Sequence, residues 1–215
     1  MYRNIVLLLA SIALIYSLPG CSKSEVQLQP LDIAQSDSQK LYLKSQQELM
    51  RENYKQAYYD YKQAVSMDEG ITNVNHLSSI LYGWAMSKVE QEDVSLLEKQ
   101  KQVWLEPKQL PLRQELVSLE VDKDKRIIHA FGIGLAPDNI SNPTQRTMMA
   151  RKVALADASA WVARIATWAD VGVSCPFDIS SETLMGMETL KEFWVDDTLY
   201  VVKVEAPVDC MRRQE

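Results

Sequence analysis

The chain has 215 residues, of which 47% are hydrophobic and 24% are charged, with 7 Gly and 8 Pro. This composition is typical of a folded protein and excludes collagen-like, low-complexity and wholly disordered chains. At roughly 150 residues per domain, the length allows one large domain or two small ones. The net charge of -6, from 23 Lys and Arg against 29 Asp and Glu, argues against a nucleic-acid partner.

Residues 1–20 have the pattern of a signal peptide. Arg3 supplies a positive charge, and residues 5–16 form an unbroken run of apolar or small side chains. This run is shorter than the roughly 20 residues that a membrane-spanning helix needs. Leu18-Pro19-Gly20-Cys21 follows and resembles a bacterial lipobox, which implies cleavage between Gly20 and Cys21 and attachment of a diacylglycerol to the Cys21 sulfur. The alternative is an ordinary secretory signal followed by a structural cysteine.

The lipobox resemblance implies a protein that is held on a membrane by its N-terminal lipid. Residues 21–38 are expected to form a polar tether that keeps the folded part off the bilayer. Full acylation, with palmitate-type chains, would exceed the two signals that stable anchoring requires. Ser22, rather than Asp, follows Cys21. This resembles the sorting signal of outer-membrane lipoproteins and implies the periplasmic face of the outer membrane.

Two cysteines remain after lipidation, Cys175 and Cys210. The oxidising envelope would permit a disulfide between them. Both lie near apolar, strand-like segments, so the sequence predicts that they are close enough in space to pair. The alternative is two separate buried thiols.

Residues 39–106 have a helical pattern, because apolar side chains recur there at helical spacing and no proline occurs between residues 31 and 106. Residues 53–68 resemble the second helix of a tetratricopeptide repeat. Ala57 and Ala64 are small enough to let a neighbouring helix approach, and Tyr61 would fill the gap between them. The resemblance implies antiparallel helical hairpins. Two roles stay open, a peptide-binding groove or paired helices that pack on each other or on a second domain.

Pro107 and Pro111 interrupt the helical pattern. Residues 107–125 are therefore predicted to be a linker between a helical domain at 39–106 and a second domain at 126–210. In this second domain, Asn142 and Pro143 predict the start of a long helix that runs to about residue 168. The strands expected there are 126–135, 190–195 and 198–205, with 171–177 as a further candidate.

The two later strands flank Asp196-Asp197, a tight-turn dipeptide that predicts a hairpin. The sequence thus predicts an α+β fold, with tetratricopeptide-like antiparallel helical hairpins followed by a small antiparallel sheet packed against one long helix. Gly132 and Gly134 are expected where the helix approaches its strand closely. The small side chains that would permit this approach on the helix are Ala150, Ala154 and Ala158.

The second domain also carries a recognisable series of motifs. Gly132-x-Gly134-x-Ala136-Pro137 is followed by Ala150-Arg151-x-x-Ala154-x-x-Asp157-Ala158 and, near the end of the chain, by Val204-Glu205-Ala206-Pro207. This order resembles the family of bacterial twenty-kilodalton outer-membrane lipoproteins, which includes lipoproteins of the flagellar outer-membrane disk. The resemblance implies an envelope lipoprotein with a structural or assembly role and no enzymatic activity. It singles out Arg151 and Asp157 as polar residues of the pattern.

No catalytic, cofactor or metal site is expected from the motifs. Gly132 to Pro137 starts like a dinucleotide loop, but its sixth position is Pro137 and no helix opens directly after it. Neither a Gly-x-Ser-x-Gly elbow nor a phosphate-binding loop occurs. His129 has no second ligand nearby in sequence, so a packed histidine is expected. Arg151 and Asp157 are each expected to form an ion pair or a bond to a neighbouring strand.

Five tryptophans are expected in the core or at a domain interface. They are Trp84, Trp104, Trp161, Trp168 and Trp194. The favoured hypothesis is a lipid-anchored envelope protein that acts as a non-enzymatic scaffold or assembly factor. Its expected partners are other envelope proteins, a second copy of the chain being a further option, and a flagellar role stays open.

The alternative is a module that binds an envelope polymer, peptidoglycan or another glycan; a hydrolase ranks third. Three structural features would separate these functions. An exposed tryptophan cluster beside a cleft would favour the polymer binder. An open sheet edge, expected along residues 198–205, would favour the scaffold. A buried pair of Asp or Glu side chains in a cleft would favour the enzyme.

Overall fold

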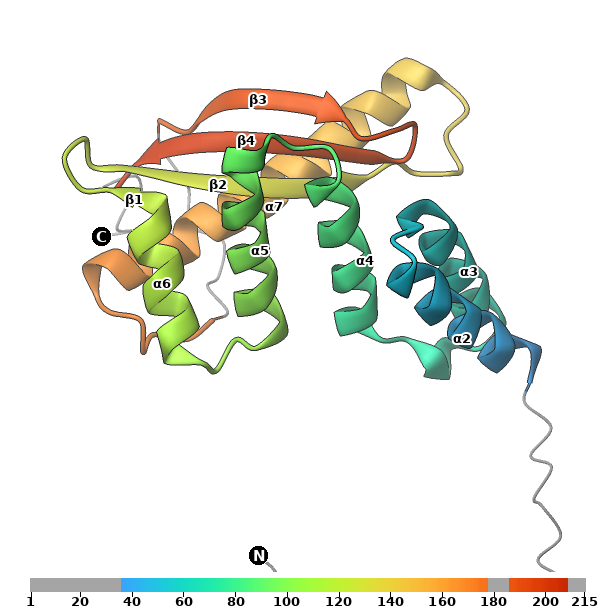
Figure 1. Cartoon of the computed structure of the whole chain (residues 1–215). Coiled ribbons are helices and arrows are strands. Elements are labelled where there is room, and N and C mark those ends of the chain that lie inside the picture. The colour runs from blue at the N-terminus through green and yellow to red at the C-terminus, as the bar shows by residue number, and fades with distance from the viewer. Residues whose placement is uncertain (1–35, 178–185, 209–215) are drawn as a thin grey trace, which may run out of the picture. The chain divides into compact units, whose positions relative to one another are not determined.

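The computed structural model describes residues 36–177 and 186–208, all of which belong to one compact unit, Gln35–Glu215. These residues form six α-helices, a short 3₁₀ helix and a four-stranded antiparallel sheet (Figure 1). The α+β class expected from the sequence is confirmed. The predicted signal peptide, Cys21 and most of the predicted tether lie outside the described residues.

The first two helices form an antiparallel hairpin. Helix α2 (Asp37–Met50) begins at a capping box, in which Ser36 accepts from the backbone of Gln39 and the Gln39 side chain accepts from the backbone of Ser36. Helix α3 (Tyr54–Met67) follows after a short turn. Ala57 and Ala64 are fully buried, as the predicted close approach of helices requires.

Helix α4 (Val74–Met86) follows the 3₁₀ helix η1 (Glu69–Ile71) and is joined to α3 by Tyr61. The Tyr61 hydroxyl accepts from the backbone N–H of Asn73 at 2.8 Å and donates to its carbonyl oxygen at 3.1 Å. Gly83 is needed in α4 because an added Cβ would lie 2.4 Å from the ring of Tyr54.

Two further helices precede the sheet, α5 (Gln91–Leu105) and α6 (Leu110–Glu120). The segment predicted as a linker, 107–125, therefore contains a helix, in which Pro111 stands in the first turn where proline is tolerated. Leu116 is fully buried. Arg113 donates from Nε to Pro107 O at 2.7 Å, and from Nη1 to Val173 O at 2.7 Å and Cys175 O at 2.6 Å.

Residues 171–177, which the sequence offers as a further strand, receive the two hydrogen bonds from Arg113 Nη1. That expectation is wrong, because the segment is an irregular turn in which Gly172 has a φ of +117°. Cys175 donates its backbone N–H to Gly172 O at 3.2 Å. The carbonyls of Val173 and Cys175 are held by a side chain of α6 rather than by a neighbouring strand.

The sheet has the strand order β1-β2-β4-β3, with all neighbours antiparallel. Its strands are β1 (Val121–Asp122), β2 (Ile127–Leu135), β3 (Glu188–Trp194) and β4 (Leu199–Pro207). The hairpin around Asp196-Asp197 is confirmed, since Asp196 Oδ1 accepts from the backbone of Thr198 at 2.7 Å. The expectation of an open edge along residues 198–205 is wrong, because β4 lies between β2 and β3.

Helix α7 (Pro143–Asp170) covers one face of the sheet. It starts at Asn142, whose side chain accepts from the backbone of Gln145 at 3.1 Å. A Cβ on Gly132 would lie 2.0 Å from Ala154 O, and one on Gly134 would lie 2.1 Å from Ala150 O. The glycines of the Gly-x-Gly motif thus bring the helix into direct contact with β2, as predicted.

Candidate functional site

Beyond its first two residues, the outer edge of β2 is closed by side chains rather than by a strand. Strand β1 pairs only with Ile127 and Ile128. Further along, Gln100 of α5 donates from Nε2 to Phe131 O at 3.0 Å and accepts from Phe131 N at 2.9 Å. Gln100 is fully buried. Its carboxamide therefore takes the place of a peptide group from a missing strand.

Asp157 closes the same edge two residues later. Its Oδ2 accepts from the backbone N–H of Ile133 at 3.0 Å. Backbone groups of Phe131 and Ile133 point the same way because alternate residues of a strand face the same edge. The motif residue Asp157 is thus bound to a neighbouring strand, one of the two roles expected for it.

A pocket of about 230 Å³ lies beside this carboxyl group, between α4, α5, α7 and β2. It is referred to below as the Asp157 pocket. Its lining residues are Ser78, Leu81, Tyr82, Trp104, Ile133, Val153 and Asp157. Two aromatic side chains, three aliphatic ones, one serine and one carboxyl group are the composition of a small ligand site.

The electrostatics of the pocket centre on Asp157. Burial raises the pKa of its carboxyl group from 3.8 to about 6, although the Ile133 N–H and the positive charge of Arg164 oppose the rise. Burial also raises the pKa of Tyr82 well above its usual value, and the Asp157 charge adds to this rise. The Tyr82 hydroxyl accepts from Trp161 Nε1 at 3.0 Å, which fixes the ring in the pocket wall.

A second group of charges lies at the start of α5. Glu90, Glu92 and Asp93 could offer three oxygens to a metal ion. Lys191 of β3 already lies among them, with Nζ 2.5 Å from Glu90 and 3.5 Å from Asp93. Lys203 of β4 contacts Asp93 at 2.5 Å. The two lysines offset most of the negative charge, so this cluster is an ionic link between α5 and the sheet.

Glu120 of α6 is buried close to these charges. It is 1% exposed, and neither carboxyl oxygen has a hydrogen-bond partner among the described residues. Burial raises its pKa well above the usual value; the nearby Lys203 opposes this and Asp93 adds to it. Asp93 and Glu120 are therefore a buried pair of acidic side chains. The charge of Asp93, however, is balanced by its ion pair with Lys203.

A serine and a histidine also meet inside the helical segment. Ser45 Oγ and His76 Nε2 are 2.8 Å apart, and both residues are buried. Ser45 donates its only proton to Ala57 O at 2.7 Å, so His76 is the donor in the second bond. A catalytic pair needs the opposite direction, from serine to histidine. Burial lowers the pKa of His76, and the pair serves to join α2, α3 and α4.

The other residues singled out in the sequence are separate from the Asp157 pocket. Arg151 donates from Nε to Glu192 of β3 at 2.6 Å, which is the ion pair expected for it. His129 lies 3.6 Å from Glu205 on β4. Cys175 is half-buried, whereas Cys210 and the cleavage position Gly20 lie outside the described residues. The pairing of Cys175 with Cys210 stays a prediction.

The tryptophans do not form an exposed cluster in the described part of the chain. Trp84, Trp161 and Trp168 are at most 5% exposed, and Trp104 and Trp194 are half-buried. Trp104 lies 6.4 Å from Trp161, measured between ring centroids. This confirms the expected core position for three of the five and leaves Trp104 as the one that lines the Asp157 pocket.

Comparison of the chain with protein-family models, curated proteins and solved structures finds no match. The resemblance to the outer-membrane lipoprotein family therefore stays a prediction from the motifs. Among the described residues, no helix combines the length and the hydrophobicity that crossing a membrane requires.

Proposed function

We propose that the protein is a lipid-anchored lipoprotein on the periplasmic face of the outer membrane, and that its folded part is a non-enzymatic scaffold for envelope proteins. The anchor rests on Arg3, the apolar run at 5–16 and the Leu18–Cys21 motif. The non-enzymatic role is supported by the site, where Asp157 is bound to a strand and the Ser45–His76 pair has its hydrogen bond in the wrong direction for catalysis.

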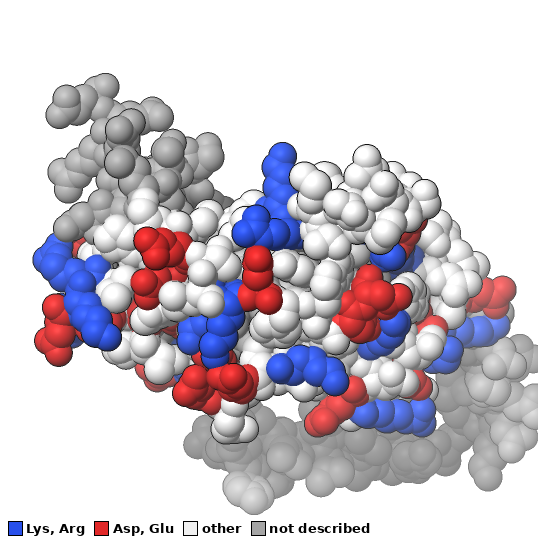
Figure 2. Space-filling model, turned by 90° about the horizontal axis from the view of Figure 1, so that it is seen from above, with Lys and Arg blue, Asp and Glu red and all other residues white. Residues whose placement is uncertain are grey.

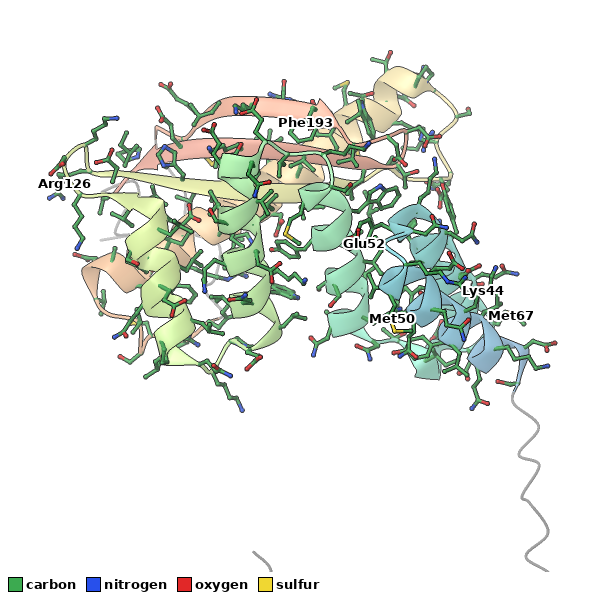
Figure 3. The ribbon with its side chains drawn as sticks, in the orientation of Figure 1. Lys44, Met50, Glu52, Met67, Arg126 and Phe193 are labelled. Carbon is green, nitrogen blue, oxygen red and sulfur yellow. The ribbon has the colours of Figure 1, made fainter. Side chains whose placement is uncertain are left out.

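The observation that carries the scaffold role is the contrast between the two edges of the sheet. Gln100 and Asp157 occupy the backbone groups of the β2 edge. No described strand pairs with the outer edge of β3, which lies on the opposite side of the sheet (Figure 1). In Figure 3, Phe193 of β3 lies away from Met50 and Met67 of the α2–α3 hairpin, and the hairpin meets the sheet at the β3–β4 turn, where Lys55 contacts Asp197 at 2.7 Å.

The register identifies which backbone groups of β3 are free to bind. Phe131 directs its N–H and C=O outward, to Gln100. Lys203, its cross-strand neighbour on β4, therefore directs its own N–H and C=O away from β2 and toward β3, where it pairs with Lys191. Glu192, the next residue of β3, therefore turns its N–H and C=O outward. An extended segment of an envelope protein can add to the sheet there as a further antiparallel or parallel strand.

The surface around β3 would make such pairing selective. A register shift between Thr189 and Lys191 interrupts the edge, and charged side chains flank it. Figure 2, viewed from above Figure 1, shows Lys and Arg side chains lying beside Asp and Glu side chains rather than in patches of one sign. A partner therefore has to match both the interruption and the local charges.

Affinity capture of the full lipidated chain from gently solubilised envelopes tests this proposal. Glu192→Pro removes the outward N–H and blocks strand addition, whereas Glu192→Ala removes the same carboxylate but keeps the N–H. The proposal predicts stoichiometric protein partners that survive Glu192→Ala and are lost with Glu192→Pro. Equal recovery with both variants would exclude docking on β3, and a chain that comes out alone would exclude the scaffold.

The anchor needs a test of its own. Cys21→Ala is expected to abolish incorporation of labelled palmitate and to release the protein from the outer-membrane fraction, with Cys175→Ala as the matched control. Continued labelling of Cys21→Ala would contradict the lipobox.

The alternative function, binding of an envelope polymer, is favoured by one observation. The Asp157 pocket presents Trp104 and a carboxyl group together, and such pairs occur in ligand sites. Pull-down of the chain with purified peptidoglycan, with and without Trp104→Ala, separates this function from the scaffold.

A further inference from the structure

The Asp157 pocket has a chemical character that its role in closing the sheet edge does not require. The bond to Ile133 uses Oδ2 alone, and Oδ1 takes part in no hydrogen bond among the described residues. The carboxyl group also lines a pocket of about 230 Å³. A carboxyl group with no pocket beside it would close the sheet edge equally well.

We infer that the Asp157 pocket binds a primary alkylammonium group, the charged end of a short aliphatic chain. Asp157 Oδ1 accepts from the ammonium, and the aromatic rings of Trp104 and Tyr82, which line the pocket, attract its positive charge. The aliphatic wall, formed by Leu81, Ile133 and Val153, contacts the methylene groups. The hydroxyl of Ser78 offers a second acceptor in the same wall.

The size of the pocket limits the ligand. A cavity of about 150 Å³ holds one benzene molecule, so about 230 Å³ has room for a chain of four or five carbons with its nitrogen. A sugar ring with its hydroxyl groups would leave most of them against aliphatic walls without partners. The pocket therefore fits one side chain or one small amine, so an envelope polymer would enter it through an amino side group and not through its backbone.

The charge and geometry favour an ammonium over other ions. A carboxylate repels anions and attracts cations, although the guanidinium of Arg164, which lies 5.8 Å from the ring centroid of Trp104, opposes a second cation. A second guanidinium would bind best to two carboxylate oxygens. Because Ile133 occupies one of them, the site offers a single oxygen, which suits an ammonium as a compact point charge.

Binding of a cation is coupled to the protonation of Asp157. The carboxyl group must be ionised to attract the ligand, and its pKa lies at about 6. The charged and titratable groups around it are Arg164 of α7 and Tyr82 of α4, neither of which changes charge between pH 5 and 8. Affinity should therefore rise about tenfold per pH unit below 6 and level off above it.

Isothermal titration calorimetry on the full chain in a non-ionic detergent tests the inference. The probes are n-butylammonium, its neutral counterpart 1-butanol, and Nα-acetyl-lysine N-methylamide. We expect n-butylammonium to bind at pH 7.5 at least about tenfold more tightly than 1-butanol, and to bind more weakly at pH 5. The lysine derivative identifies the source of the ammonium group. If the natural ligand is a lysine-type side chain, the derivative binds as well as n-butylammonium; if it is a free amine, only n-butylammonium binds.

The matched variants are Asp157→Asn, which keeps an oxygen for Ile133 but not the charge, and Asp124→Asn, which removes an exposed carboxylate in the β1–β2 turn. Asp157→Asn should lose at least about tenfold in affinity for n-butylammonium, and Asp124→Asn should lose none. Equal binding of the amine and the alcohol to the unmodified chain would overturn the inference even if Asp157→Asn fails to fold. Absence of binding by both amines would also overturn it. The inference does not depend on β3, so it can fail while the scaffold stands.

Discussion

Gln100 of α5 and Phe131 of β2 exchange two hydrogen bonds, at 2.9 and 3.0 Å, between a side-chain carboxamide and a backbone peptide. The two residues are 31 positions apart, and both are buried. Through this exchange a helix completes a strand edge. Beyond Ile128 this edge of β2 is closed without a further strand, and among the described residues no strand pairs with the outer edge of β3.

Replacing Gln100 by Ala should destabilise the protein by about 2–4 kcal/mol, because the buried N–H and C=O of Phe131 both lose their partner. Urea unfolding of the full chain measures this loss. Gln102→Ala is the control on the same helix, since Gln102 is only half-buried and bonds to neighbouring side chains of α5. A loss of equal size in both variants would contradict the role of Gln100.

Gly132→Ala should be more damaging than Gly172→Ala. A Cβ at Gly132 would lie 2.0 Å from Ala154 O, whereas nothing lies within 4 Å of a Cβ at Gly172. The first change forces α7 off the sheet and should cost more than about 3 kcal/mol. Gly172→Ala is opposed only by the positive φ of the backbone at this position, which should cost about 1–2 kcal/mol. Thermal unfolding that ranks the two in the reverse order would contradict the contact between β2 and α7.

Asp157 should make the folded state less stable as the pH rises. Its pKa is higher in the folded state, about 6, than the ordinary value of 3.8, so the folded state binds the proton more tightly. The contribution of Asp157 to the free energy of unfolding is therefore most favourable below about pH 4, decreases between pH 4 and 6, and is lost above about pH 6. Asp157→Asn should remove this dependence and raise stability at pH 7 by about 1–3 kcal/mol. A pH dependence equal to that of the unmodified chain would contradict the assignment.

Glu120→Gln should also stabilise the protein at neutral pH. The carboxyl group is 1% exposed, its oxygens lack hydrogen-bond partners among the described residues, and burial raises its pKa. The neutral amide avoids the cost of a buried charge beside Asp93. Chemical unfolding at pH 7.5 compares it with Glu115→Gln, a change at an exposed carboxyl group of the same helix. Lower stability of Glu120→Gln would show that Lys203 compensates the charge fully.

The features that sequence analysis predicted correctly depend on residues close together in the chain. Gly132 and Gly134 stand next to each other on one strand face, and Ala150, Ala154 and Ala158 recur every four residues on one helix face. Their close packing follows from these local spacings. The turn at Asp196-Asp197 is equally local.

The features that sequence analysis missed join distant residues. Neither Gln100 nor Phe131 belongs to a motif, and the pair forms only after α5 is placed beside β2. The order of the strands was missed for a similar reason. The side chains of residues 198–205 alternate in character with a period of two, which predicts a strand. The central position of β4 in the sheet, however, depends on its pairing with both β2 and β3. A polar residue with glutamine's reach within an apolar helix stripe is the only signal that could have pointed to Gln100.

Amide hydrogen exchange, compared between Phe131 and Glu192, tests the contrast between the two edges most directly. We predict that the Phe131 N–H exchanges slowly both in the isolated lipidated chain and in its captured complex, because Gln100 binds it. The Glu192 N–H should exchange rapidly in the isolated chain and become protected in the complex. Protection of Glu192 in the isolated chain, or equally rapid exchange in both states, would contradict the proposal that β3 is the edge on which an envelope partner assembles.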